Sequence, residues 1–151
     1  MFGGEESGGY GFAMHLPERD GIVADLFILD FMLKTKKKPS ELIKELMAMA
    51  GPSFYLRRDL HFDAASYPEV KQRVMAALDR STPTSLAGRA VARIVQLDTK
   101  DGTKFFLDDG SWLLLRLSGT EPLVRVYAET RSQAELAPLL DAGEKIVREA
   151  K

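Results

Sequence analysis

Residues 111–129 read S-W-L-L-L-R-L-S-G-T-E-P-L-V-R-V-Y-A-E, which predicts a strand, a short loop and a second strand. Apolar and β-branched residues dominate both flanks, over 111–117 and 123–129, as strands require. The polar S-G-T-E-P run between the flanks is typical of a loop. A sheet would hold this loop rigidly at its edge, where binding loops usually lie.

The same loop gathers donors for an anion. Arg116 and Arg125 can each present a planar fork of N–H groups to phosphate oxygens. Ser118 and Thr120 add hydroxyl donors, and Gly119 lets the backbone turn its amides toward an anion. We therefore predict a phosphate cradle. Residue types alone leave a plain hairpin turn with two solvated arginines as an alternative.

A second motif, G-G-E-E-S-G-G-Y-G, covers residues 3–11 and holds five glycines in nine positions. Glu5, Glu6 and Ser7 offer carboxylates and a hydroxyl that suit the vicinal hydroxyls of a sugar. The spacing is not that of a nucleotide loop, and adjacent carboxylates would repel a polyphosphate. Taken alone, a flexible glycine-rich terminus is the alternative interpretation.

Together the two motifs resemble the α-D-phosphohexomutase superfamily, the phosphoglucomutase and phosphomannomutase enzymes. In that family a G-E-x-S-G loop of the third domain reads the sugar hydroxyls. An R-x-S-G-T-E-P-x-x-R loop of the fourth domain holds the phosphate that is not being transferred. Both occur here in that order. The resemblance implies sugar contacts at Glu5 and Ser7, and phosphate contacts at Arg116, Ser118, Gly119, Thr120 and Arg125.

Two details refine this resemblance. Glu6 fills the variable position of the sugar loop, and Gly9 stands where many members have histidine, which looks closer to bacterial phosphoglucomutases. Residues 15–22 read H-L-P-E-R-D-G-I, and family members carry a basic residue directly before such a D-G pair. The resemblance therefore adds Arg19 to the sugar-phosphate site. His15 lies in the same segment, but a lone loop histidine is more often solvated, and we interpret His61 as structural.

The resemblance implies an intramolecular phosphotransferase, an isomerase that interconverts hexose 1-phosphate and 6-phosphate. It also implies a phosphoserine, a hexose 1,6-bisphosphate intermediate and Mg²⁺. No T-A-S-H-N-P-like nucleophile loop or D-G-D-x-D-R-like metal loop occurs, and Asp108-Asp109-Gly110 is typical of a hairpin turn. We therefore expect the C-terminal part of a longer enzyme, inactive alone, whose other domains are its partners.

Two questions stay open at this stage. A non-catalytic sugar-phosphate-binding or interaction module is the alternative function, because the nucleophile and metal motifs are missing from the sequence. The residues also leave the choice among glucose, mannose and glucosamine phosphates undecided.

Composition excludes several other classes of protein. The 151 residues are 45% hydrophobic, and 21 basic against 22 acidic residues give a net charge of -1, which argues against a nucleic-acid footprint. The apolar stretch 22–33 is interrupted by Asp25 and Asp30 and is too short to span a bilayer. Lys36 to Lys38 read as a solvated helix end. With no cysteine and no signal peptide visible, we expect a cytoplasmic protein.

Gly51-Pro52 divides the predicted fold. We predict that residues 1–51 are the remnant of an α/β domain, with helices from about 21 to 36 and from an N-cap at Ser40. Their apolar faces would cover the rest of that domain, each other or a dimer contact. Residues 52–151 are predicted to form an α+β domain, an antiparallel sheet with helices on one face, which agrees with the TATA-binding-protein-like fourth domain of the family.

The elements of this second domain can be placed by pattern. We expect strands over 54–62, 89–97, 103–107, 111–117 and 123–129, with turns at 101–102 and 109–110. One helix should open at Pro68. A second should start at Ser132, with Glu135 completing an S-x-x-E capping box.

Overall fold

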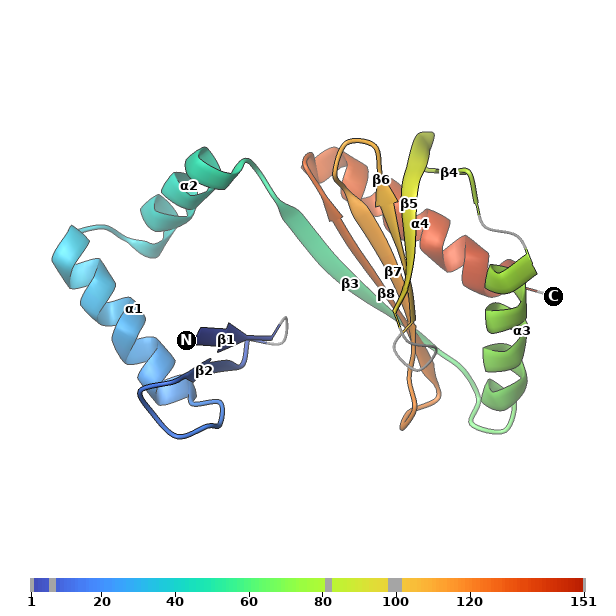
Figure 1. Ribbon diagram of the computed structural model, residues 1–151, viewed down its shortest axis with the longest axis horizontal. Helices are drawn as coiled ribbons and strands as arrows, with labels where there is room; N and C mark the ends of the chain where they lie inside the picture. The colour runs from blue at the N-terminus through green and yellow to red at the C-terminus, as the bar shows by residue number, and fades with distance from the viewer. Residues whose placement is uncertain (1, 6–7, 81–82, 98–101, 151) are drawn as a thin grey trace. The chain divides into compact units, whose positions relative to one another are not determined.

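The computed structural model describes residues 2–5, 8–80, 83–97 and 102–150, and the described chain forms two compact units, residues 1–50 and 51–151. Helix and strand labels follow Figure 1.

Unit 1 begins with a short antiparallel hairpin of β1 (Phe2–Gly4) and β2 (Tyr10–Phe12), in which Gly3 lies opposite Gly11. The hairpin brackets the G-E-E-S-G loop, which sequence patterning placed in a loop without flanking strands. Three-residue strands rich in glycine carry no alternation that could predict them.

Two helices complete unit 1. Helix α1 (Gly21–Thr35) begins at Asp20, whose carboxylate accepts from the Val23 amide at 3.0 Å, and ends at Lys36 in the left-handed conformation with φ 56°. Helix α2 (Pro39–Ala50) begins one residue before the predicted N-cap Ser40. That prediction is wrong because Lys38 fills the role: its carbonyl accepts from Leu42, and its amide donates to Glu41. Proline at the first helical position needs no N–H partner.

Unit 2 is built on a six-stranded antiparallel sheet with the order β3-β8-β7-β6-β5-β4 (Figure 1). The strands are β3 (Phe54–His61), β4 (Ser85–Leu86), β5 (Arg89–Leu97), β6 (Gly102–Leu107), β7 (Trp112–Leu117) and β8 (Leu123–Thr130). The predicted strands agree with β3 and β5 to β8 within one or two residues. Asp101, part of a predicted turn, lies outside the described residues.

Strand β4 escaped prediction because its hairpin uses an unusual turn. Ala87 and Gly88 both have positive φ, at 49° and 77°, as a two-residue hairpin of the mirror-image type requires. Alanine rarely occupies this conformation, so the sequence gives no turn signal there.

One face of the sheet carries the core. In β6 and β7 every second side chain is buried, and α3 (Tyr67–Arg80) and α4 (Gln133–Glu149) pack on that face. Both helices contribute to the same hydrophobic cluster. Its buried members from the helices are Val70, Val74, Leu78, Leu139, Leu140 and Val147. The predicted α+β class, with helices on one face of an antiparallel sheet, is confirmed.

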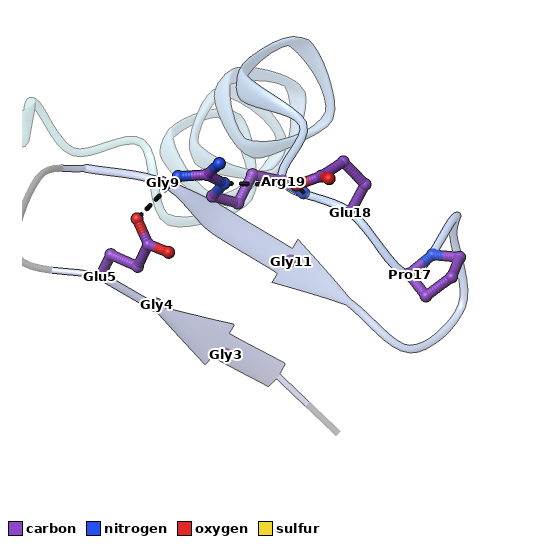
Figure 2. Close-up of a pocket in the computed structure, with 8 residues that line it drawn as sticks. All are labelled: Gly3, Gly4, Glu5, Gly9, Gly11, Pro17, Glu18 and Arg19. Carbon is purple, nitrogen blue, oxygen red and sulfur yellow. Dashed lines mark hydrogen bonds and ion pairs between the residues drawn. The ribbon is translucent and has the colours of Figure 1, made fainter.

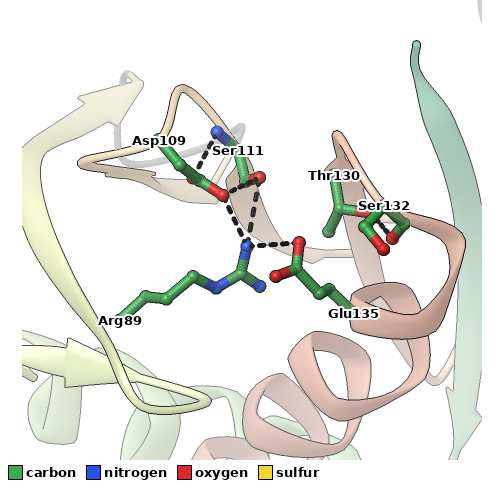
Figure 3. Close-up of polar contacts among 6 residues, drawn as sticks. All are labelled: Arg89, Asp109, Ser111, Thr130, Ser132 and Glu135. Atoms are coloured by element: carbon green, nitrogen blue, oxygen red, sulfur yellow. Dashed lines mark hydrogen bonds and ion pairs between the residues drawn. The ribbon is translucent and has the colours of Figure 1, made fainter.

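A polar junction ties three parts of unit 2 together (Figure 3). A terminal nitrogen of Arg89 donates to Asp109 at 2.8 Å, to Ser111 at 3.2 Å and to Glu135 at 3.3 Å. Arg89 thereby links the start of β5, the β6–β7 turn and the first turn of α4. The predicted capping box is wrong, because Ser132 makes no side-chain cap bond and Glu135 turns to Arg89 instead.

None of the helices within the described residues combines the length and apolar character needed to cross a membrane.

Candidate functional site

A pocket of about 450 Å³ lies in unit 1, between the β1–β2 hairpin and the segment that leads into α1 (Figure 2). Four glycines of the hairpin leave its floor without side chains, and its polar groups come from Glu5, Glu18 and Arg19. The full lining is Gly3, Gly4, Glu5, Gly9, Gly11, Pro17, Glu18 and Arg19.

Arg19 is held between two carboxylates of this pocket. One terminal nitrogen donates to Glu5 Oε2 at 2.9 Å, and its Nε donates to Glu18 Oε1 at 3.3 Å (Figure 2). The Arg19 amide adds a 2.8 Å bond to Glu18, and this bond, with the Arg19 side chain, lowers the pKa of the Glu18 carboxyl. Hydrogen bonds to Glu18 and Glu5 raise the pKa of Arg19 further. The structure therefore brings Glu5 and Arg19 together and adds Glu18, which sequence analysis missed.

Gly9 explains how Arg19 reaches Glu5. A Cβ built on Gly9 would lie 2.6 Å from Arg19 Cδ, closer than real side chains approach. The arginine therefore occupies the space that a side chain at position 9 would need, which matches the absence of the histidine seen in many family members. Glu6 and Ser7, the remaining residues of the predicted sugar loop, lie outside the described residues.

His15 supports the start of α1. Its Nε2 lies 2.8 Å from Asp20 Oδ2, while the other oxygen of Asp20 caps the helix. The backbone bond from Val23 and the bond from His15 lower the pKa of Asp20. His15 is absent from the pocket lining, and its contact orients the segment that carries Arg19.

The second group of predicted residues lies in unit 2, where β7 and β8 meet. Arg116 and Arg125 are direct partners in the antiparallel register of these strands, so both side chains start from the same face of the sheet. Both residues are half-buried. Like charges at directly opposed positions destabilise a sheet. The pairing therefore places two cationic side chains next to each other near the loop between β7 and β8.

The loop between these strands is shaped by Ser118. This residue is 6% exposed, and its hydroxyl oxygen accepts from the amides of Glu121 at 3.1 Å and Thr120 at 3.4 Å. The hydroxyl proton is still available for donation. Gly119 and Thr120 are exposed at the tip. Apart from its two chain neighbours, no described residue has an atom within 4 Å of a Cβ built on Gly119, so the space around it is open.

Glu121, an acidic residue of the same loop, makes a contact that the motif does not predict. Its Oε2 accepts from a terminal nitrogen of Arg125 at 2.8 Å, so the loop's own carboxylate binds one of the two arginines. Asp59 of β3 lies opposite Arg125 on the other side of β8. Arg125 is thus flanked by two acidic side chains as well as by Arg116.

Comparison with known families decides the relationship. The model of the phosphoglucomutase/phosphomannomutase C-terminal domain matches residues 69–145, and that of the α/β/α domain III of the same family matches residues 1–50. The chain belongs to the phosphoglucomutase/phosphomannomutase family.

Relatives agree with this assignment. A phosphoglucomutase/phosphomannomutase of Thermococcus kodakarensis is 35% identical over 148 residues, which cover 98% of this chain and 28% of the relative. A phosphoglucosamine mutase of Methanocaldococcus jannaschii is 33% identical over 151 residues, which cover 99% of this chain and 30% of the relative. The chain therefore spans less than a third of the length of these relatives.

Solved structures share the fold. A phosphoglucomutase/phosphomannomutase family protein from Burkholderia thailandensis superposes with a TM-score of 0.67 at 21% identity, over 99% of this chain and 28% of that one. The open form of parafusin, a phosphoglucomutase from Paramecium, superposes with a TM-score of 0.60 at 22% identity. The match covers 95% of this chain and 29% of that one.

The Mg²⁺ that the family implies finds no ligand set in the described parts of this chain. A magnesium site needs several oxygen ligands around one point. No group of three histidine, aspartate or glutamate side chains comes together within the described ranges. The described residues do not fit the ion, and we derive no metal-dependent step from them.

Proposed function

We propose that this chain forms the part of a phosphohexomutase that reads the sugar hydroxyls and holds the phosphate that is not being transferred. Glu5, Ser7 and Arg19 would contact the sugar. Arg116, Ser118, Gly119, Thr120 and Arg125 would contact the phosphate.

The opposed arginines of β7 and β8 carry this proposal. Arg116 and Arg125 lie across from each other in register at the mouth of a loop that presents the Gly119 amide and the Thr120 side chain to solvent. Two guanidiniums held at adjacent positions are stabilised by a dianion between them, and each can bind phosphate oxygens in a bidentate way.

The cradle suits a reaction in which the same sugar is held in two orientations. Phosphoryl transfer between C1 and C6 passes through a bisphosphate that must turn around between its half-reactions. Donors on rigid strands can grip whichever phosphate is not reacting, and this fixes the other end of the sugar for attack. Domain closure over the ligand would exclude water. We assign the phosphoserine, the metal and the chemical step to other domains of the parent enzyme, and we expect the isolated chain to be inactive.

The unit 1 pocket supplies the sugar-reading part of the proposal. The Glu5 carboxylate can accept hydrogen bonds from two vicinal hydroxyls, and Arg19 fixes its orientation from 2.9 Å away. The names of the relatives cover glucose, mannose and glucosamine phosphates. We therefore propose hexose phosphates as the substrate class, without choosing among the three sugars.

Binding of glucose 1-phosphate to Arg116→Ala tests the phosphate cradle. We expect saturable changes in the amide NMR signals of Ser118, Gly119 and Thr120 in the parent chain. Loss of one charge-assisted donor should weaken binding by about 1.5–3 kcal/mol, or about 10- to 150-fold. Arg73→Ala removes an exposed arginine of α3 and should bind like the parent. Equal affinity of the parent and Arg116→Ala would remove Arg116 from the site.

The alternative of a stand-alone binding module makes a different prediction about size. Such a module would be found in its source cells at 16.8 kDa. A domain pair of a mutase would be found in a polypeptide about three times longer, in line with the 28% coverage of the Thermococcus relative. An immunoblot of cell extract against this chain separates the two.

A further inference from the structure

One phenol reaches both ends of the phosphate loop from outside it. The Tyr67 hydroxyl lies 2.8 Å from the carbonyl oxygen of Ser118 and 2.8 Å from that of Leu123. Ser118 and Leu123 also close the loop, because the Ser118 amide donates to the Leu123 carbonyl at 3.1 Å. The phenol has a single proton, which the two carbonyls share as a three-centre bond.

The other contacts of the loop are mostly internal. Ser118 Oγ accepts from two amides of the tip, and the Leu123 amide donates to Glu121 O at 2.8 Å. A further backbone contact comes from Phe62, whose amide donates to Pro122 O at 2.9 Å. Phe62 and Tyr67 mark the two ends of the short connection between β3 and α3: Phe62 directly follows β3, and Tyr67 is the first residue of α3. This connection is therefore the part of unit 2 that fixes the loop against the helical layer.

Tyr67 is itself well placed to act as an anchor. It is the first residue of α3, its amide donates to Asp63 O at 3.0 Å, and its ring packs at 6.4 Å from the ring of Phe62. Both rings pack against the hydrophobic core. Burial raises the pKa of the Tyr67 phenol, and the positive charge of Arg125 offsets this only in part. The phenol therefore remains a neutral donor at physiological pH.

The bond to Ser118 sets the direction of the next amide. In a trans peptide the carbonyl of residue 118 and the N–H of residue 119 point in opposite directions. Holding the Ser118 carbonyl toward Tyr67 turns the Gly119 N–H away from α3. Within the described residues this N–H has no hydrogen-bond acceptor, and the space around Gly119 is open. The geometry leaves it ready to donate to a ligand.

We propose that Tyr67 is a positioning residue of the phosphate loop, which fixes the Gly119 amide as a preformed donor to the bound phosphate. This inference rests on the proposed function of the loop. It concerns a residue 51 positions away from Ser118 in sequence, which no motif of the loop includes.

Tyr67→Phe removes the hydroxyl and keeps the ring. Tyr127→Phe is the matched control, because the buried Tyr127 hydroxyl, in strand β8 near Arg125, makes no hydrogen bond in the described structure. Both variants and the parent, each as the 151-residue chain labelled with ¹⁵N, would be titrated with glucose 1-phosphate, and their thermal unfolding would be measured alongside. We expect Tyr67→Phe to bind about three- to tenfold more weakly, the effect of one hydrogen bond. The ligand-induced shift of the Gly119 amide should shrink, while Tyr127→Phe binds like the parent.

The possible outcomes separate the role of Tyr67 from the proposed function of the loop. If the parent binds, and Tyr67→Phe binds equally well with an unchanged Gly119 shift, Tyr67 has no positioning role while the proposed function stands. If Tyr67→Phe loses its folded spectrum, the hydroxyl supports the whole unit and local positioning is refuted. If the parent itself does not bind, the proposed function of the loop fails, and the role of Tyr67 fails with it.

Discussion

Glu121 competes with the ligand that we propose for its own loop. Its carboxylate lies 2.8 Å from a terminal nitrogen of Arg125, and its side chain is 56% exposed. Phosphate binding to Arg125 must displace this contact or share the guanidinium with it. Exposed ion pairs of this kind contribute little to stability, so the exchange is energetically easy.

Neutralising Glu121 should therefore strengthen phosphate binding. We expect Glu121→Gln to bind glucose 1-phosphate about two- to tenfold more tightly, because it removes a competing and repelling carboxylate. Calorimetric titration would measure the change. Glu149→Gln alters the net charge equally at an exposed position of α4 and should have little effect. Weaker binding by Glu121→Gln would mean that the carboxylate organises the loop for its ligand.

Asp109 makes the junction of Figure 3 sensitive to acid. Burial opposes its charged form, but bonds from Ser111 and Arg89 outweigh this effect, and the pKa of Asp109 lies below its ordinary value. A depressed carboxyl pKa contributes stability above the unfolded-state pKa of about 3.9, and this contribution is lost as the pH falls through the folded-state value. Asp109→Asn should therefore have a lower free energy of unfolding than the parent at pH 7. Its free energy of unfolding should fall less than that of the parent when the pH is lowered below about 4.

Chemical unfolding at pH 7 and at a series of lower pH values would measure this difference. Asp108→Asn, in the same turn but outside the Arg89 junction, should follow the pH profile of the parent. Identical profiles for the parent and Asp109→Asn would show that the Arg89 junction does not depend on the charge of Asp109.

Local motifs predicted most of the candidate site residues. Arg116 to Arg125 form one continuous segment of strand, loop and strand, so their residue types and spacing could be read directly from the sequence. Glu18 directly precedes Arg19, but no residue pattern there predicts the hydrogen bonds between them. Tyr67 carries no local signal, because the fold alone brings it to a loop 51 residues away. The capping box at Ser132 failed for the same reason, since Arg89 binds Glu135 from another element.

At the level of elements, alternation predicted the sheet because one face is buried. In β6 and β7 buried and half-buried residues alternate without exception, which is the pattern that reveals a strand. Apolar spacing likewise located α3 and α4. The short strands β1, β2 and β4 span two or three residues each, too few for any period to appear.

Helix α4 depends on a glycine for its approach to the sheet. A Cβ built on Gly143 would lie 2.6 Å from Val126 Cγ1 and 3.0 Å from Leu113 Cδ1. We expect Gly143→Ala to lower the free energy of unfolding by about 1–3 kcal/mol through overpacking, despite the better helix propensity of alanine. Lys145→Ala, at an exposed position of the same helix, should change stability by less than about 0.5 kcal/mol. Denaturant unfolding would compare them, and a neutral or stabilising Gly143→Ala would refute the close contact.

For the whole molecule, the two units differ in how much they bury. Helix α1 is apolar on all sides, yet it has no buried residue, and Ile22, Leu26 and Leu33 are at least 59% exposed. A helix of this kind normally lies inside a larger core. The match of residues 1–50 to domain III supports the proposal that the remainder of that domain covers it in the parent enzyme. A dimer contact through these helices stays a proposal as well.

The difference in burial between the two units predicts which part of the chain can fold alone. Every buried hydrophobic residue of the described chain falls between Leu60 and Ala150, within unit 2. Residues 51–151 produced separately should therefore unfold cooperatively and keep the amide spectrum of β6 to β8 seen in the whole chain. Residues 1–50 should show helical circular dichroism at most, without a cooperative transition, because neither helix buries a side chain. Loss of cooperative unfolding in 51–151 would mean that unit 1 completes its core, so the stability of the phosphate cradle would depend on both units together.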